Sequence, residues 1–184
     1  MTTANVRRAG LRLGLGLTMA AAALVCAAAA NLPPQPAKSL DTNKFVGRWF
    51  EVARMPNKIQ TGCANSLADW AHDGSAQFKV VQTCHMDSPT GHAKVWKASG
   101  KIIDPATNAK FRMSFFGGLI SQDYWVLDRA DDYSWIILST PNPKFLWIFS
   151  RAPSVSAAQK AALVARTRAM GYDVAAMIYD QPAG

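Results

Sequence analysis

The chain has 184 residues and a formal net charge of +8, from 20 Lys and Arg against 12 Asp and Glu. Its basic residues are scattered and form no run, so the charge supports solubility and some attraction to anionic lipid surfaces but argues against nucleic-acid binding. After residue 30 no apolar stretch approaches the length of a membrane span. The remaining chain is long enough for one domain with one sizeable core.

The first 30 residues have the pattern of a secretory signal that is removed after export. Three arginines precede an apolar run, no acidic residue is present, and three alanines at 28–30 fit a cleavage site. The exported chain is therefore expected to begin near Asn31, with a linker at 31–40 and a single domain at 41–184. It would keep 17 basic residues against 12 acidic ones, a net charge of about +5.

Two other interpretations of this segment stay open. The first is a transmembrane anchor, for which this segment is short and rich in Ala. The second is a lipoprotein signal that ends at Cys26. Val25 is bulky where a lipoprotein signal has a small residue, so removal of Cys26 with the signal is preferred. Arg7 and Arg8 are only a weak indication of twin-arginine export. The expected location is the periplasm, with association to the outer membrane as the second choice.

Cys63 and Cys84 are the only cysteines left once the signal is removed. Two cysteines in an exported chain favour a disulfide, and two free thiols are the alternative. Closing a loop of about 20 residues would stabilise the fold by roughly 3 kcal/mol in the chain-entropy description.

Short runs typical of β-strands follow the Pro-rich linker and are separated by turn residues. No helical pattern interrupts them, which favours an antiparallel barrel or sandwich over a parallel sheet. The eight predicted strands span 49–53, 67–71, 78–83, 95–103, 110–116, 124–127, 134–139 and 145–150.

One helix is predicted after the last strand, over about residues 156–170. Ser156 and Gln159 form a capping box, and Gly171 is placed to end the helix. Five alanines recur at helical spacing, and we expect this small face to cover the last strand, which is apolar on both faces. These alanines are Ala158, Ala161, Ala162, Ala165 and Ala169.

Gly47 and Trp49 open the first strand, Asp132 and Tyr133 open a later one, and Arg151 closes the last strand before the helix. These three short blocks, in this order, resemble those of the lipocalin family. The segment NKFVGRWFEVARMPNK and the run YWVLDRADDYSWIILSTPNPKFLWIFSRAP are similar to the bacterial, apolipoprotein D-like branch, and the resemblance covers about residues 39–182.

This resemblance implies an all-β fold: an eight-stranded antiparallel up-and-down barrel with one closed end, one open mouth and a C-terminal helix packed outside. Eight strands enclose enough space for side chains or one small ligand. The resemblance also implies that Arg151 lies over Trp49 at the closed end. Such a cation–π contact is worth about 1 to 2 kcal/mol when desolvated, and a structural role is expected for both residues.

Glu51 is the only Glu in the chain. Strand alternation places Trp49, Glu51 and Ala53 on one face, so an inward Trp49 brings the other two inward as well. A buried carboxylate needs a charged or hydrogen-bonding partner, or it binds a proton. Parity allows Arg112 and Tyr124 as partners. A satisfied structural carboxylate is the preferred interpretation, and a role in ordering water or a ligand head group is the alternative.

Seven residues are predicted to line the cavity, because large flat side chains and Met suit an adaptable apolar pocket. A slip of one residue in strand register would reverse every assignment. The predicted residues are Ala53, Trp96, Ala98, Met113, Phe115, Tyr124 and Trp135.

The resemblance implies binding and transport or storage of a small hydrophobic ligand, such as a fatty acid or lysophospholipid, in lipid maintenance of the cell envelope. No catalysis, cofactor or metal site is expected. The three histidines, His72, His85 and His92, lack metal-ligand spacing, and no nucleophile or phosphate-loop motif occurs. The expected partners are the ligand and a membrane surface, and the chain is expected to be a monomer or a weak homodimer.

Two rival functions remain. A lipocalin-type enzyme acting on a lipid would use Glu51 with Tyr124 as its acid and base. A carrier of haem or another tetrapyrrole would use His85 or His92 near the mouth.

Overall fold

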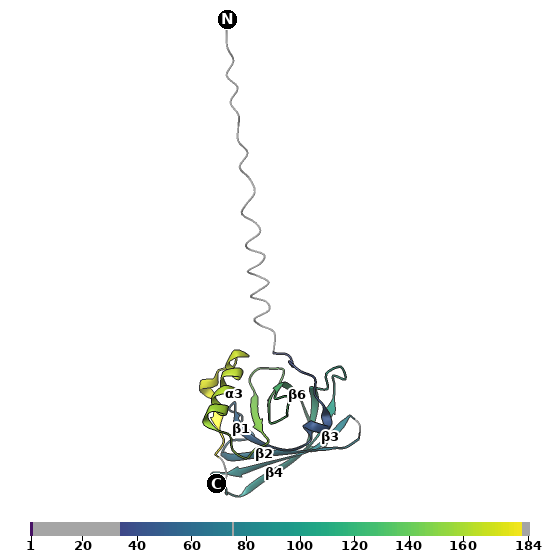
Figure 1. Ribbon diagram of the computed structural model, residues 1–184. Helices are drawn as coiled ribbons and strands as arrows, with labels where there is room; N and C mark the ends of the chain where they lie inside the picture. Colours follow the sequence, from purple (N-terminus) through teal and green to yellow (C-terminus); the bar gives the residue numbers. More distant parts are fainter. Residues whose placement is uncertain (2–33, 75, 182–184) are drawn as a thin grey trace. The chain divides into compact units, whose positions relative to one another are not determined.

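Eight antiparallel strands follow one another around a closed barrel in the computed structural model (Figure 1). Each strand from β1 to β8 pairs with its neighbours in the chain, and the pairing of β1 with β8 closes the sheet. The strands are β1 (Gly47–Arg54), β2 (Cys63–His72), β3 (Gln77–Met86), β4 (Ala93–Ile102), β5 (Lys110–Phe115), β6 (Ile120–Arg129), β7 (Trp135–Ser139) and β8 (Leu146–Ser150).

The structure describes residue 1 and residues 34–74 and 76–181, so the predicted signal, its cleavage site and Cys26 lie outside the described residues.

Short elements complete the fold. A terminal strand pairs with β1, and the predicted barrel with its C-terminal helix is confirmed. The remaining elements are α2 (Thr42–Phe45), the 3-10 turns η1 (Phe116–Gly118) and η2 (Val174–Ala176), α3 (Ala157–Ala169) and β9 (Ile178–Tyr179).

The strand connections alternate between the two ends of the barrel, as up-and-down topology requires. Loops 73–76, 103–109 and 130–134 lie at the end that α2 covers, which we call the closed end. Loops 55–62, 87–92, 116–119 and 140–145 lie at the other end, which we call the open end.

Aromatic side chains fill the closed end. Phe45 of α2 stacks on Phe111 with ring centroids 5.4 Å apart and meets the edge of Trp70 at 4.9 Å. Phe78 packs against the same rings, and Trp49 donates its indole N–H to the carbonyl of Phe45 at 2.8 Å. Offset and edge-to-face packing of this kind adds to the stabilisation that burial alone supplies. We call these five residues the aromatic plug.

Arg151 lies over the ring of Trp49, 3.6 Å from its centroid, as the family resemblance implied. Its guanidinium also donates to the carbonyls of Lys44, Phe45 and Val46 at 2.7, 2.9 and 3.0 Å, and to that of Arg48 at 2.7 Å. Partial burial lowers the pKa of Arg151. One side chain therefore ties the chain before β1 to the end of β8.

The predicted helix is confirmed, but the face that it buries is not the predicted one. Ser156 accepts a hydrogen bond from the backbone N–H of Gln159, and Gly171 ends the helix with φ of +91°. Leu163 and Thr167 are the buried residues of α3, whereas all five alanines of the predicted face are exposed. Larger side chains reach the outer surface of the sheet, and the alanines face solvent.

A bulge in β1 overturns the alternation assumed from the sequence. Glu51 pairs with Phe149 of β8, but Ala53 pairs with Ile148, so Val52 is the extra residue. Ala53 therefore packs, fully buried, in the cluster between the barrel and α3. The prediction that Ala53 shares the inward face of Trp49 is wrong.

Trp135 also lies on the outer face of the barrel. Arg166 of α3 lies 5.2 Å above its ring, whereas Ile136 and Leu138 belong to the inner cluster. The strand Trp135–Ser139 has apolar side chains on both faces, so alternation alone could not decide which face is inward.

The predicted disulfide is present. Cys63 and Cys84 are bonded, with their Cα atoms 5.5 Å apart, and join the start of β2 to the end of β3 at the open end.

Replacing Arg151 with Ala should lower the free energy of unfolding by roughly 2–4 kcal/mol, because it removes a desolvated cation–π contact and the donors for four carbonyls. Urea unfolding followed by Trp fluorescence measures the loss. Arg48→Ala is the matched control. Its side chain is 56% exposed and pairs with Asp69, so its loss should stay within about 1 kcal/mol. Equal losses in the two variants would contradict the structural role of Arg151.

Candidate ligand-binding site

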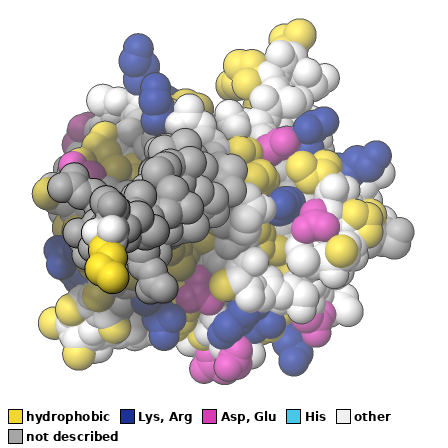
Figure 2. All heavy atoms as spheres, turned by 90° about the horizontal axis from the view of Figure 1, so that it is seen from above, with side chains coloured by type: hydrophobic (Ala, Val, Ile, Leu, Met, Phe, Trp, Pro, Cys, Tyr) yellow, Lys and Arg dark blue, Asp and Glu magenta, His cyan; other side chains and the backbone are white. Residues whose placement is uncertain are grey.

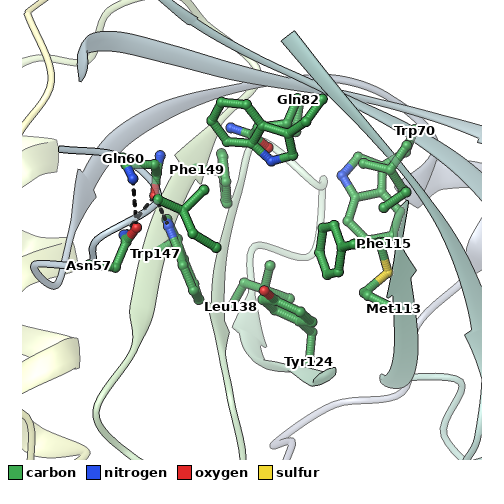
Figure 3. Close-up of a pocket in the computed structure, with 15 residues that line it drawn as sticks. Asn57, Gln60, Trp70, Gln82, Met113, Phe115, Tyr124, Leu138, Trp147 and Phe149 are labelled. Carbon is green, nitrogen blue, oxygen red and sulfur yellow. Dashed lines mark hydrogen bonds between the residues drawn. The ribbon is translucent and has the colours of Figure 1, made fainter. Parts of the chain in front are cut away.

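The barrel interior holds a cavity of about 80 Å³ between the aromatic plug and the open end. Its wall is mostly aromatic and aliphatic, and the polar side chains of Asn57 and Gln60 lie together at one side (Figure 3). The lining residues are Asn57, Ile59, Gln60, Ala68, Trp70, Val80, Gln82, Trp96, Ala98, Met113, Phe115, Tyr124, Leu138, Trp147 and Phe149.

Five of the seven residues predicted from the sequence lie on this wall: Trp96, Ala98, Met113, Phe115 and Tyr124. They come from β4, β5 and β6, where alternation runs without interruption through the predicted positions. Ala53 and Trp135 are placed outside the cavity by the bulge and by the register of β7. Contact of the five with a ligand stays a prediction.

Sequence reasoning missed the other wall. Trp147 and Phe149 alternate with Leu146 and Ile148 on β8, and the last two pack towards α3. This alternation was visible in the sequence, but a strand apolar on both faces does not show which set is inward. The residues from loop 55–62 carried no signal, because a loop has no side-chain period.

Gln60 connects the cavity wall to a buried polar cluster. Its side chain accepts hydrogen bonds from the indole N–H of Trp147 at 2.7 Å and from the amide of Asn57 at 2.8 Å. Its amide donates to Glu51 at 2.7 Å and to the hydroxyl of Ser66 at 3.2 Å. Both ends of a buried amide are thus satisfied, which fixes loop 55–62 as part of the wall.

Glu51 lies behind Gln60 and has other partners than the predicted Arg112 and Tyr124. Its carboxylate accepts from Arg54 at 2.8 Å, and the side chains of the pair are 0% and 2% exposed. Arg112 instead pairs with Asp123 on the surface. Glu51 is therefore the satisfied carboxylate that the preferred interpretation described, but its arginine is a different one.

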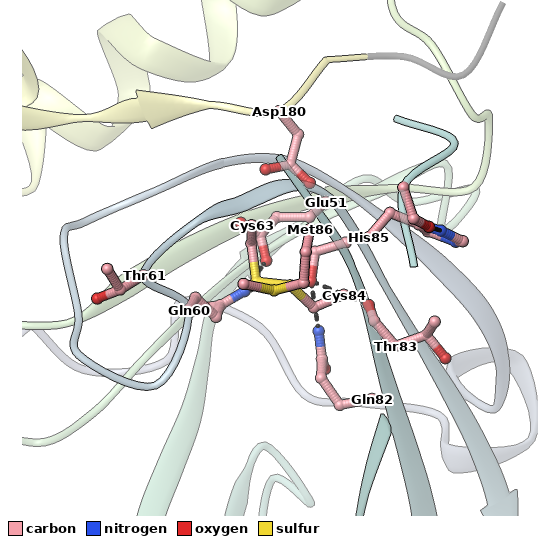
Figure 4. The surroundings of a disulfide bond; sticks show 12 residues. Glu51, Gln60, Thr61, Cys63, Gln82, Thr83, Cys84, His85, Met86 and Asp180 are labelled. Carbon is pink, nitrogen blue, oxygen red and sulfur yellow. Dashed lines mark hydrogen bonds between the residues drawn. A yellow bond between two sulfur atoms is a disulfide. The ribbon is translucent and has the colours of Figure 1, made fainter. Parts of the chain in front are cut away.

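Asp180 is the second carboxylate on Arg54. It hydrogen bonds to the same Nη1 atom that binds Glu51, and its other oxygen is buried without a hydrogen-bond partner among the described residues. The Nη2 atom of Arg54 donates to the carbonyl of Cys63 at 2.8 Å. Figure 4 shows Glu51 and Asp180 beside the disulfide. Two carboxylates thus share one buried guanidinium.

Burial dominates the titration of this cluster. It raises the pKa of Glu51, against the opposing effect of Arg54. Burial, followed by repulsion from Glu51, raises the pKa of Asp180 from 3.8 to about 8. Because one guanidinium cannot neutralise two desolvated carboxylates, the cluster retains a proton near neutral pH.

The hydroxyl of Tyr124 is a polar group in the cavity wall. Its hydroxyl makes no hydrogen bond within the described residues, and burial raises its pKa to about 12. Its ring packs 5.6 Å from that of Trp147 and 6.5 Å from that of Phe115. A neutral hydroxyl in this position can donate a hydrogen bond to a polar ligand group.

The groups required by the two rival functions are not brought together. Glu51 is bonded to Arg54 and Gln60, not to Tyr124. His85 bonds to the carbonyl of Gly91 in loop 87–92, and neither His85 nor His92 lines the cavity. Over residues 34–74 and 76–181 no group of three or more His, Cys, Asp or Glu could hold a metal ion.

The surface carries mixed charge. On the face shown in Figure 2, Lys and Arg side chains are interspersed with acidic and hydrophobic ones and form no continuous basic patch. Within the part of the chain that the structure describes, no helix combines the length and apolar character needed to cross a membrane.

A barrel with a plugged end, an open end and an apolar interior cavity defines a protein of the calyx class. Residues 40–182 match the family model described as a lipocalin-like domain, and the chain belongs to this family.

Relatives agree with this membership and with the predicted bacterial branch. The outer membrane lipoprotein Blc of Vibrio cholerae is 26% identical over 148 residues, which cover 80% of this chain and 85% of that protein. Mouse apolipoprotein D is 26% identical over 117 residues, covering 63% of this chain and 59% of that protein. The structure of insecticyanin from Manduca sexta shares the fold, with a TM-score of 0.64, 21% identity and coverage of 81% and 84% of the two chains.

The stability of the protein should fall as pH rises from about 4 to 8, because folded Asp180 holds its proton up to a pKa of about 8 whereas the unfolded chain releases it near 3.8. The stability contributed by this group is complete below the lower value and lost through the upper one. Asp180→Asn should flatten the dependence of the melting temperature on pH.

Asp131→Asn is the control for this measurement. A hydrogen bond from Lys38 lowers the pKa of Asp131, so this group stays ionised throughout the same pH range. A wild-type profile without a decline, or an equal decline in Asp180→Asn, would contradict the shared proton.

Proposed function

We propose that this protein reversibly binds an acyl lipid, a fatty acid or a lysophospholipid, in its barrel without catalysing a reaction, and that it serves lipid transport or maintenance in the cell envelope. The observation that carries the proposal is the cavity itself, whose wall is apolar except for Asn57, Gln60, Gln82 and Tyr124. Such a wall takes an alkyl chain and leaves a few polar groups to orient its head.

The size of the cavity bears on how the ligand enters. At about 80 Å³ it is smaller than most pockets for small molecules, so an acyl chain needs the wall to move. Met113 is unbranched and adaptable, and the partly buried Trp96 and Phe115 line the same cavity. Burying about ten methylenes at roughly 0.8 kcal/mol each yields about 8 kcal/mol, which corresponds to micromolar binding before losses.

Two features favour a ligand with a polar or anionic head. The unpartnered hydroxyl of Tyr124 supplies a hydrogen-bond donor inside the cavity. Lys94 lies 5.9 Å from the ring centroid of Trp96, on the inward parity of β4 and nearer the open end. A carboxylate or phosphate at the mouth would meet this cation.

The proposed envelope role is supported by the relatives named outer membrane lipoproteins. Removal of the signal near residue 30 remains our preferred interpretation, with lipidation at Cys26 as the alternative. The intact mass of the protein purified from cells distinguishes them, since a chain beginning at an acylated Cys26 is heavier and lipid-modified.

Native mass spectrometry of the protein purified without detergent, with lipid extraction of the same sample, tests the proposal directly. We expect one acyl lipid per chain. A protein that is empty, and whose Trp emission responds to neither palmitate nor lysophosphatidylglycerol, would contradict the proposed function.

Ala98→Phe should weaken palmitate binding at least tenfold, because the added ring occupies the cavity, at a stability cost of about 1–3 kcal/mol. Quenching of Trp emission reports binding, since Trp70, Trp96 and Trp147 line the cavity. Ser99→Phe is the matched control, because Ser99 is exposed on the opposite face of β4. Equal affinity of both variants would place the ligand outside the barrel.

A further inference from the structure

Large exposed apolar side chains gather at the open end of the barrel. Single exposed hydrophobic residues are ordinary, but a group of them on one part of a surface marks an interaction site. Three lie within five residues where β5 passes into β6, and two more lie on loop 55–62 and at the start of β4. Their exposed fractions are 67% for Phe116, 87% for Leu119, 55% for Ile120, 61% for Ile59 and 52% for Val95.

The connection from β5 to β6, residues 116–119, exposes Phe116 and Leu119, and we call it the tip. Phe116, Gly117 and Gly118 all have positive φ, of 52°, 70° and 98°. A Cβ atom placed on Gly117 or Gly118 would have no neighbour within 4 Å. The two glycines leave open space beside the turn, and nothing within the described residues covers Leu119.

Lysines outnumber carboxylates at the open end. The loops there contain Lys58 and Lys144 against one Asp, and Lys94 lies beside them on β4. These three lysines make no ion pair with the described residues.

A lysine without an ion pair, Lys97, also lies next to the tip. Lys79 and Lys97 line a groove on the outer face of β3 and β4 together with Phe116, Gly117 and Gly118. Lys79 is paired with Asp73, but Lys97 makes no ion pair within the described residues. Exposed apolar side chains flanked by unpaired ammonium groups are complementary to a membrane with an anionic surface.

We propose that the open end of the barrel docks onto an anionic lipid bilayer, with Phe116, Leu119 and Ile120 inserted at the boundary of head groups and acyl chains. Lys58, Lys94, Lys97 and Lys144 contact the anionic head groups. The closed end faces away from the membrane. This placement goes beyond the proposed carrier function, because it depends on the surface and not on the contents of the cavity.

Vesicle flotation with the mature protein purified from cells tests the docking. We expect binding to phosphatidylcholine vesicles that contain phosphatidylglycerol, weaker binding to phosphatidylcholine alone, and a decrease with added salt because ions screen the lysines. The double variant Phe116→Ser with Leu119→Ser should lose at least tenfold in vesicle partitioning. Ile103→Ser, which removes an exposed apolar side chain at the closed end, should bind like the wild type.

A second variant tests the charges without touching the tip. Lys58→Gln, Lys94→Gln and Lys144→Gln together should lower partitioning onto anionic vesicles by roughly tenfold to a hundredfold and leave binding to neutral vesicles unchanged. Melting curves confirm that each variant is folded.

Three results would overturn the docking. The first is a wild-type protein that does not bind anionic vesicles, and the second is binding that survives both variants, which would assign it to another part of the chain. The third is a dimer that the double variant dissociates, without vesicle binding, because the apolar tip would then be covered by a second copy. Loss of palmitate binding in Ala98→Phe with normal vesicle binding separates this surface from the cavity.

Discussion

The buried guanidinium of Arg54 joins three segments on which the candidate site depends. It bonds to Glu51 on its own strand, to Asp180 after β9, and to the carbonyls of Gln60 and Cys63 at the two ends of the turn before β2. Arg54 is 1% exposed, and an uncompensated charge at that depth costs several kcal/mol. If the loop or the C-terminal segment moved away, this buried guanidinium would lose two carbonyl partners or one of its two carboxylates, so the cluster holds the polar side of the cavity in place before any ligand arrives.

Much of the fold follows from the sequence because barrel strands and their turns are local signals. Alternation and turn residues predict the eight strands. Ser156 predicts the start of the helix, and the two cysteines predict the disulfide. The face of α3 was not predictable in the same way. A face of small alanines and a face that contains Leu163 are both compatible with close packing. The shape of the outer surface of the barrel decides which face of α3 is buried. A pattern within one helix does not contain the shape of its neighbour.

The cavity was only partly predictable, for two physical reasons. Alternation assigns faces only while the strand is regular, and the bulge at Val52 sent Ala53 to the helix side although Trp49 points inward. Alternation also fails where both faces are buried, as in β7 and β8. The partner of Glu51 was missed because Arg54 reaches it across that bulge, at a separation that a regular strand would place on opposite faces.

The two sides of the cavity differ in how firmly they are held, and this difference connects the interior to the open end. Gln60, Trp147 and Asn57 are locked by hydrogen bonds to one another and to the Arg54 cluster. The side chains of Met113, Phe115 and Tyr124 on the facing wall make no side-chain hydrogen bond with the described residues, so they can change rotamer without breaking one. Because the resting cavity is small, space for an acyl chain has to come from this second wall. Its strands, β5 and β6, are joined at the open end by the turn at 116–119, so the adaptable wall and the exposed apolar tip belong to one hairpin. A force that a membrane applies to that tip would act on the wall that must move, and not on the wall that Arg54 fixes.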